Sequence, residues 1–121
     1  MSWNGVERRK YRRVPIRLQL DGGGASPDGR FEHRAELVPG GFAEVCGRLA
    51  RGSAVRWSFD AAGALDFNIH YHQDKQVVFP VKRSGAAKGA ATLKVKLDQD
   101  YCWMWTNKTT QALSLHLTLA R

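Results

Sequence analysis

Hydrophobic and polar residues alternate along most of the chain after residue 30. In the segment 54–60, for example, Val55, Trp57 and Phe59 share one face, and the residues between them are mostly polar. A period of two residues is typical of a β-strand with one buried face. The same alternation predicts further strands over 65–71, 76–82, 92–97, 101–106 and 113–119. Only the segment 43–50 is short and ambiguous enough to allow a helical turn.

Turn-forming residues separate these predicted strands. Small residues at 61–63 and polar residues at 73–75 and 98–100 predict turns, and the segment 83–89 predicts a loop. Pro80 indicates an edge strand or a bulge. About six to eight short strands with one apolar face each must bury those faces against one another. The sequence therefore predicts an all-β fold, an antiparallel β-sandwich, with most of its tryptophan, tyrosine and phenylalanine side chains in the core.

The chain length is that of one domain. It has 121 residues, of which 43% are hydrophobic and 25% charged, as in ordinary globular proteins. No apolar run approaches the roughly 20 residues of a membrane-spanning helix. We expect a basic N-terminal segment with a Gly-rich linker over 1–30, followed by the sandwich domain over 31–121. Within the first segment, residues 14–20 alternate and could form an edge strand, where Pro15 is tolerable.

The formal net charge of +8 is concentrated near the N-terminus. The basic residues within ten positions are Arg8, Arg9, Lys10, Arg12, Arg13 and Arg17. Without them the chain is only mildly basic, so a nucleic-acid partner is not expected. One interpretation of the cluster is a solvated tail. The other is an anion-binding site for the phosphate groups of nucleic acid or lipid, contacted by Arg8, Arg9, Arg12 and Arg13.

The same cluster resembles a known ligand-binding motif. Residues 7–13, Glu-Arg-Arg-Lys-Tyr-Arg-Arg, are similar to the Arg-x-x-x-Arg opening of PilZ domains, which bind cyclic-di-GMP through guanidinium groups. The downstream Asp/Asn-x-Ser-x-x-Gly motif of those domains does not occur in this sequence. Cyclic-dinucleotide binding is therefore kept only as an alternative function.

The stretch 36–119 resembles the GOLD (Golgi dynamics) domain, the lumenal β-sandwich of early secretory-pathway cargo receptors and some lipid-transfer proteins. The resemblance rests on Cys46 after 42–45, Gly52 ahead of the strand 55–59, the strand 65–69, and the late motif Tyr-Cys-Trp-Met-Trp-Thr-Asn at 101–107. It implies a two-sheet sandwich of jelly-roll or immunoglobulin-like architecture that binds a protein or a small ligand. No membrane helix or sorting tail follows Arg121, so the receptor role is not expected here.

The chain has two cysteines, Cys46 and Cys102, which allow one intramolecular pairing. The resemblance implies a disulfide, because lumenal GOLD domains often pair two cysteines at matching places. The alternative is that each cysteine is a small buried hydrophobic residue. A disulfide requires an oxidising compartment, yet no apolar signal segment follows the basic N-terminus. We therefore expect a periplasmic, secreted or lumenal protein if this N-terminus is not native, and a cytoplasmic one if it is.

Three side chains form a candidate metal site. His70 and His72 alternate on one strand and share a face, and Met104 shares a face with Cys102 on another strand. Imidazole and thioether ligands suit copper, so a copper site of His70, His72 and Met104 is one hypothesis. The alternative is that the histidines lie on a solvated face and Met104 fills a gap. If Cys102 is in a disulfide, it cannot be a thiolate ligand.

Motifs that support catalysis are missing from the sequence. It has no nucleophile elbow, no phosphate-binding glycine loop, no His-Glu-x-x-His and no Cys-x-x-Cys. The pattern Asn-Lys-Thr at 107–109 fits an N-glycosylation acceptor. We therefore predict a non-enzymatic module with a protein partner and no cofactor, with copper handling and N-terminal anion binding as the alternatives.

Overall fold

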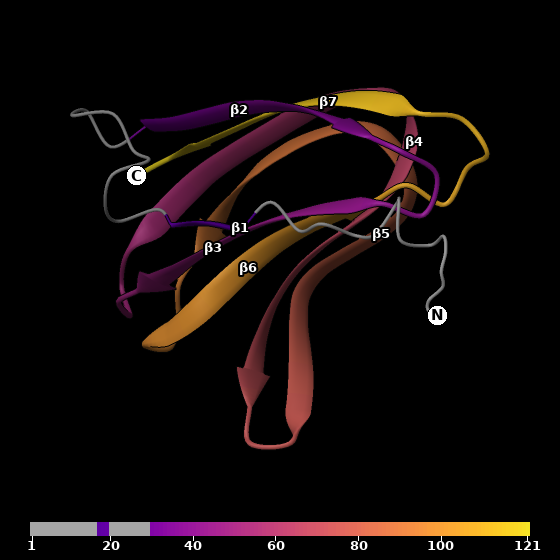
Figure 1. Ribbon diagram of the computed structural model, residues 1–121. Helices are drawn as coiled ribbons and strands as arrows, with labels where there is room; N and C mark the ends of the chain where they lie inside the picture. Colours follow the sequence, from indigo (N-terminus) through magenta and orange to yellow (C-terminus); the bar gives the residue numbers. More distant parts are fainter. Residues whose placement is uncertain (1–16, 20–29) are drawn as a thin grey trace.

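The computed structural model describes residues 17–19 and 30–121 of the chain. The candidate anion-binding residues Arg8, Arg9, Arg12 and Arg13 lie outside the described residues. The described part contains seven strands: β1 (Arg17–Gln19), β2 (Arg30–Leu37), β3 (Phe42–Leu49), β4 (Ala54–Gln73), β5 (Gln76–Lys94), β6 (Gln99–Thr106) and β7 (Leu113–Ala120) (Figure 1). This confirms the predicted all-β fold. The ambiguous segment 43–50 is strand β3, and the described residues include no helix that could cross a membrane.

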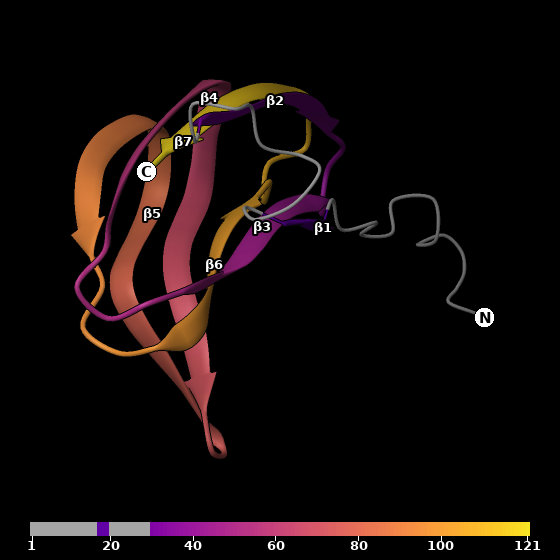
Figure 2. The ribbon, with the colours of Figure 1, turned by 90° about the vertical axis from the view of Figure 1, so that its left-hand side faces the viewer.

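The strands form one sheet that curls into two layers. The sheet order is β1-β3-β6-β4-β7-β2, and β5 pairs with β4 outside this path. The first part of β4, residues 56–61, pairs with β7, whereas residues 66–70 pair with β6. One layer therefore contains β2, β7 and the first half of β4, and the other contains β1, β3, β6 and the second half. Figures 1 and 2 show β4 and β5 curving together from one layer into the other.

The long β4–β5 hairpin corrects two sequence-based predictions. The turn predicted at 61–63 and the loop predicted at 83–89 are wrong, because both segments are parts of continuous strands. Their register shifts between Asp60 and Leu65, where the strands bend. A Cβ atom on Gly63 would lie 3.0 Å from a methyl carbon of Leu113, so a glycine lets the bent strand approach β7 closely. Small residues mark a bend within a strand here and not a chain reversal.

Part of the N-terminal segment belongs to the sheet. The predicted edge strand within 14–20 occurs as β1, which pairs in parallel with β3 at the end of the sheet order. Leu18 lies opposite Val45 in this register. The basic segment is therefore anchored to the sandwich at the described residues 17–19.

The core between the layers is rich in aromatic residues, as the alternation predicted. Phe67 lies at its centre, with its ring centroid 4.8 Å from that of Trp57, 5.0 Å from that of Phe59 and 5.2 Å from that of Trp105. Trp57 and Phe59 come from the first half of β4 and Trp105 from β6, whereas Phe67 belongs to the second half of β4, so this cluster holds the two layers together. Within residues 30–121, the buried phenylalanine, tyrosine and tryptophan residues are Phe31, Trp57, Phe59, Phe67, Tyr101, Trp103 and Trp105.

A buried polar side chain organises the loops at one end of the sandwich. Asn107 is fully buried, and its Nδ2 donates hydrogen bonds to the carbonyl oxygens of Leu37 and Gln111. Its Oδ1 accepts hydrogen bonds from both the backbone N–H and the hydroxyl of Thr109. In the folded chain, Nδ2 of Asn107, the atom that would carry a glycan in the Asn-Lys-Thr pattern, is thus buried and donates two hydrogen bonds.

An ion pair ties the bend of the hairpin to the β6–β7 loop. Lys108 Nζ lies 3.1 Å from a carboxylate oxygen of Asp66, and the backbone N–H of Gly85 donates to the other oxygen at 3.0 Å. The hydrogen bond from Lys108, followed by that from Gly85, holds the pKa of Asp66 below its usual range, although partial burial opposes this. The carboxylate form is therefore favoured by folding.

This pair predicts a measurable acid dependence. Because the folded-state pKa of Asp66 is lowered, its stabilisation is present above the unfolded-state pKa of about 4 and is lost as pH falls through the folded-state value. We expect Asp66→Asn to be less stable than wild type at neutral pH, with a difference that shrinks below about pH 4. Urea unfolding across the acid range measures this difference.

The matched control for that measurement is Asp74→Asn. Asp74 lies at the hairpin turn with φ of 57°, a conformation that asparagine also tolerates. We expect this variant to follow the wild-type acid profile. A constant difference between wild type and Asp66→Asn at every pH would contradict the assignment to the carboxylate.

Candidate functional site

The most unusual polar cluster lies on the outer face of the layer formed by β3, β6 and β4. We call it the outer patch; its members are Glu44, Cys46, Asn68, His70, Cys102 and Met104. They occupy two adjacent rows across the three strands: Cys46 lies opposite Cys102, which lies opposite His70, and Glu44 lies opposite Met104, which lies opposite Asn68. The intervening residues of each strand face the core. The patch thus follows directly from strand alternation combined with the register.

A disulfide crosses the first row of the outer patch. Cys46 and Cys102 are joined with a Cα–Cα distance of 4.1 Å, and they are the two cysteines of the chain. The pairing that the resemblance implied is therefore present in the structure. Its alternative, two buried free cysteines, is wrong, since both side chains are half-buried on the outer face.

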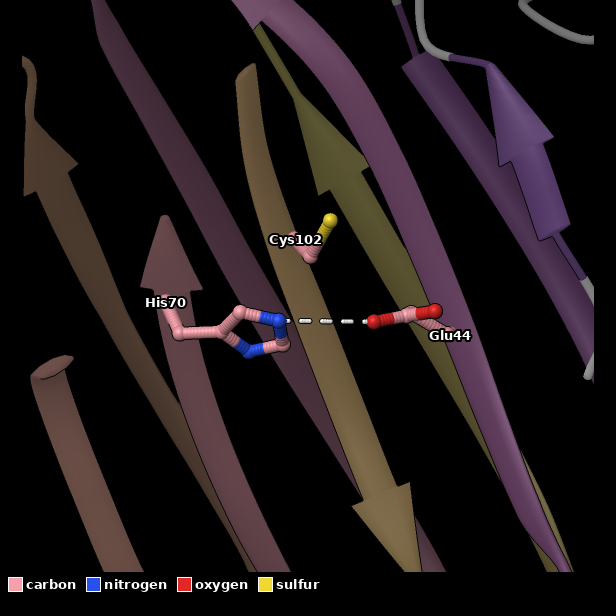
Figure 3. Close-up of side chains that lie close together, drawn as sticks. All are labelled: Glu44, His70 and Cys102. Atoms are coloured by element: carbon pink, nitrogen blue, oxygen red, sulfur yellow. Dashed lines mark ion pairs between the residues drawn. The ribbon is translucent and has the colours of Figure 1, made fainter. Parts of the chain in front are cut away.

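His70 and Glu44 meet across β6 in the outer patch (Figure 3). His70 Nε2 lies 3.4 Å from a carboxylate oxygen of Glu44, and the two residues are 7% and 8% exposed. On the other side of the ring, His70 Nδ1 lies 2.6 Å from Oδ1 of Asn68. The sulfur of Cys102, the Glu44 oxygen and a His70 ring nitrogen all lie within 4.8 Å of one another.

The hydrogen bond to Asn68 determines what the other ring nitrogen can do. An amide oxygen only accepts, so His70 Nδ1 carries the proton in this arrangement. In a neutral ring, Nε2 then presents a lone pair towards the Glu44 carboxylate, and two acceptors face each other. A positive charge between them, from a proton or a metal ion, makes this contact favourable. The outer patch is therefore suited to hold a cation.

The structure places the predicted copper ligands on one face, because β4 and β6 are neighbours. The rings of His70 and His72 lie edge to face with centroids 5.5 Å apart, and Met104 lies opposite Asn68. The solvated-face alternative fits His72, which is exposed, but is wrong for His70, which is buried. The copper hypothesis for His70, His72 and Met104 stays a prediction.

Sequence reasoning missed two residues of this cluster, Glu44 and Asn68, as partners of His70. Glu44 lies in the segment that allowed a helical turn, where its face could not be assigned. A strand assignment would have put Glu44 and Cys46 together on the face opposite Val45. Their approach to His70 depends on β6 lying between β3 and β4, which no local pattern reveals.

The end of the β4–β5 hairpin projects beyond the sandwich, as Figures 1 and 2 both show. Near this end Val77 and Phe79 are 43% and 42% exposed, among the most exposed large apolar side chains in the described part of the chain. Phe79 packs beside His70 with a centroid distance of 5.9 Å, and Lys82 Nζ lies 4.7 Å from the Phe79 ring centroid. The hairpin end therefore continues the outer patch with an apolar, cationic border.

Strand β5 also carries a strong charge bias. It contains four cations and no carboxylate, and all four side chains are exposed: Lys82, Arg83, Lys88 and Lys94. Among the strands that the structure describes, β5 pairs only with β4, so its second edge is not used by another described strand. We call this strand the basic edge. Cations on an edge strand discourage pairing with another copy of the same strand.

A shallow depression on the outer face of β2, β4 and β7 has a different character. It is lined by Leu115 and small residues together with Arg34, Glu36, Asp60 and His116. Beside it, Nε2 of His116 contacts the carboxylate of Glu32, and this hydrogen bond holds the pKa of Glu32 below its usual range. Positive and negative groups alternate here, so this face favours neither sign of charge.

Comparisons with known proteins reveal relatives in structure only. No protein-family model matches the chain, and no curated protein matches it. A solved structure of Aeromonas hydrophila PliG, a periplasmic inhibitor of g-type lysozyme, aligns over 88% of this chain and 96% of its own, with a TM-score of 0.60 and 9% identity. Salmonella Typhimurium PliG aligns over 87% and 96%, with a TM-score of 0.55 and 7% identity. This chain is thus similar to PliG in fold.

A third structure extends this likeness. The pre-peptidase C-terminal domain of a collagenase from Bacillus anthracis aligns over 88% of this chain and 95% of its own, with a TM-score of 0.61 and 12% identity. At these identities the likeness to PliG and to this domain establishes the β-sandwich fold alone. None of these three structures is described as a GOLD domain, so GOLD membership stays a prediction.

Proposed function

We infer that this chain is a non-enzymatic module that binds an acidic partner protein in an extracytoplasmic compartment, through the basic edge and the projecting end of the β4–β5 hairpin. The observation that carries this proposal is that β5 combines exposed Val77 and Phe79 with four exposed cations. One edge of this strand is not paired with another described strand. Exposed apolar side chains bordered by charge are typical of protein interaction sites.

The charge of the basic edge indicates the chemistry of the partner. With no carboxylate along the whole strand, the edge attracts an acidic surface and repels a basic one. Such attraction increases the rate of encounter and weakens as salt increases. The apolar pair Val77 and Phe79 favours a folded protein over a simple polyanion, because a protein can bury both side chains.

Two observations support the compartment. The Cys46–Cys102 disulfide is of a kind that persists in oxidising compartments and is rare in the reducing cytosol. The PliG proteins that share the fold are described as periplasmic and as inhibitors of another protein. By analogy of fold, a protein-binding role outside the cytoplasm is proposed for this chain, without lysozyme as its specified partner.

Site-specific crosslinking tests the proposal. A photoreactive amino acid at Val77 is expected to give one discrete protein adduct in the organism that encodes the chain, whereas the same group at the exposed Ser114 on β7 is not. The Val77 adduct is expected to fall about tenfold in the Lys82→Glu/Lys88→Glu variant, because reversal of two edge charges weakens an acidic contact. Quantification of the adduct by immunoblot measures both effects.

A matched charge reversal away from the hairpin is the control. Arg34→Glu changes an exposed arginine on β2 and is expected to leave the Val77 adduct unchanged. Equal adducts from Val77 and Ser114, or an adduct that nuclease removes, would contradict a protein partner at the hairpin. The mass of the natively purified protein after alkylation with and without reduction tests the compartment, and two free thiols would argue against it.

A further inference from the structure

We propose that reduction of the disulfide converts the outer patch into a binding site for one borderline-soft divalent cation of the zinc type. The four ligands are the thiolates of Cys46 and Cys102, Nε2 of His70 and the carboxylate of Glu44. This site goes beyond the protein-binding role, because it uses the outer face of β3, β6 and β4 and not the basic edge.

The distance between the first two ligand atoms suits a shared ion. A tetrahedral ion with bonds of about 2.0–2.1 Å to nitrogen and oxygen holds those two atoms about 3.3–3.4 Å apart. His70 Nε2 and the Glu44 carboxylate oxygen lie 3.4 Å apart. The histidine and the carboxylate therefore already have the separation of two ligands on one metal ion.

The sulfur atoms lie beside this pair. Sγ of Cys102 is within 4.8 Å of both the Glu44 oxygen and a His70 ring nitrogen, and Sγ of Cys46 is bonded to it. Figure 3 shows the Cys102 side chain on β6 between His70 and Glu44. Once the S–S bond is broken, rotation of the two side chains about their Cα–Cβ bonds brings thiolates towards the ion without moving the strands.

Asn68 fixes the tautomer that a metal ligand requires. Its amide oxygen accepts the Nδ1 proton of His70 at 2.6 Å, which leaves the lone pair on Nε2 and directs it to the cluster. Metal-binding histidines commonly donate their second N–H to such an oxygen, which orients the ring. Asn68 is thus a positioning residue for the proposed site.

The redox step balances with a dithiol as the reductant. The dithiol gives two electrons and two protons to the Cys46–Cys102 disulfide, becomes a cyclic disulfide, and leaves two thiols on the chain. A divalent ion then replaces the two thiol protons, so binding releases protons. In the oxidised chain the sulfurs carry no thiolate, and only His70 and Glu44 remain as ligands.

The fold can tolerate this reduction because the disulfide does not lie in the core. Its neighbours Val45 and Trp103, which face the opposite side of the same strands, are fully buried. The hydrogen-bonded register of β3 with β6 runs over eight residue pairs, of which the cysteine pair is one. Reduction thus removes a crosslink but leaves the packing that aligns the ligands.

Spectroscopic titration of the full chain with Co²⁺ tests the site. The disulfide is reduced with a phosphine, which becomes a phosphine oxide by taking its oxygen atom from water. The phosphine is then removed under anaerobic conditions. We expect the reduced wild type to bind one Co²⁺ with thiolate charge-transfer and tetrahedral visible bands, about 100-fold more tightly than the oxidised chain. Zn²⁺ is expected to displace Co²⁺ and to protect both cysteines from alkylation.

Single substitutions assign the ligands. His70→Ala is expected to weaken Co²⁺ binding to the reduced chain about 100-fold, and Asn68→Ala about tenfold, while both keep two thiols. His33→Ala, on β2 in the other layer, is the matched control and is expected to bind as wild type does. Near-ultraviolet circular dichroism of the buried tryptophans verifies that each reduced variant is folded.

Three results would overturn the proposal. The first is binding by reduced His70→Ala as tight as wild type, which would indicate adventitious thiol binding. The second is the absence of thiolate bands in the reduced wild type. The third is loss of the tryptophan circular dichroism on reduction, since the ligands come from three strands and the site needs the folded sheet. These results leave the hairpin crosslink unaffected, so the two proposals fail independently.

Discussion

The oxidised wild type is expected to exceed the Cys46→Ala/Cys102→Ala variant by about 4 kcal/mol in the free energy of unfolding. The disulfide closes a loop between residues 56 positions apart, and the crosslink restricts the unfolded chain more strongly than the folded one. Urea denaturation of the two proteins without reductant measures the difference.

The control for this prediction is the wild type kept reduced and free of metal ions. It should unfold close to the double alanine variant, because both lack the crosslink. A difference below about 1 kcal/mol between the oxidised and reduced wild type would contradict the loop-closure argument. Since small domains are stable by about 5–15 kcal/mol, the reduced chain is expected to remain folded at room temperature.

Asn107→Ala is expected to destabilise the fold by about 3 kcal/mol. The substitution removes four side-chain hydrogen bonds at a fully buried position and takes the Asn107 donor from the buried carbonyl oxygen of Leu37. The carbonyl oxygen of Gln111 keeps the Thr109 hydroxyl as a partner. Unsatisfied buried acceptors are costly because water cannot replace the lost partner. The midpoint of urea unfolding reports the loss.

Asn107→Asp separates the roles of the two ends of this amide. Aspartate keeps an acceptor for Thr109 but places a carboxylate against the two carbonyl oxygens, so we expect it to be at least as destabilising as alanine at neutral pH. Thr110→Ala, an exposed change in the same loop, is expected to stay within about 0.5 kcal/mol of wild type. A stable Asn107→Asp variant would show that the two donated hydrogen bonds contribute little.

The sequence predicts the class of the fold because period-two alternation is a local property. The strands predicted over 101–106 and 113–119 occur in the structure. The strand predicted over 92–97 is wrong beyond Lys94, where β5 ends, and the turn predicted at 98–100 is wrong at 99–100, where β6 begins. Alternation does not distinguish a bend from a turn, and the small residues at 61–63 therefore suggested a break in what is one strand. The strand β4 stays continuous because it pairs with β5 and contacts Leu113 closely. Both are tertiary contacts, which a local sequence pattern does not reveal.

The candidate site could be predicted only in part for the same reason. Alternation correctly put His70 and Asn68 on the same face of one strand, and Cys102 and Met104 on the same face of another strand. The burial of His70 and its contact with Glu44 depend on the order β3-β6-β4, in which the middle strand comes last in sequence. Of the exposed cations of β5, Arg83 and Lys88 were assigned to a loop, whereas Lys82 and Lys94 were assigned to two separate strands. Their common strand appeared only with the long hairpin.

The continuity of β4 and β5 through both layers also bears on how the molecule comes apart. In a sandwich whose strands each belong to one sheet, the sheets could separate as units. Here the two longest strands, β4 and β5, each contribute to both layers. Phe67 near the bend packs against Trp57 in the first half of β4 and against Trp105 on β6 in the other layer. Opening one layer would therefore remove packing contacts from the aromatic side chains of the other layer. Local unfolding of a single layer is therefore disfavoured, and the sandwich behaves as one cooperative unit.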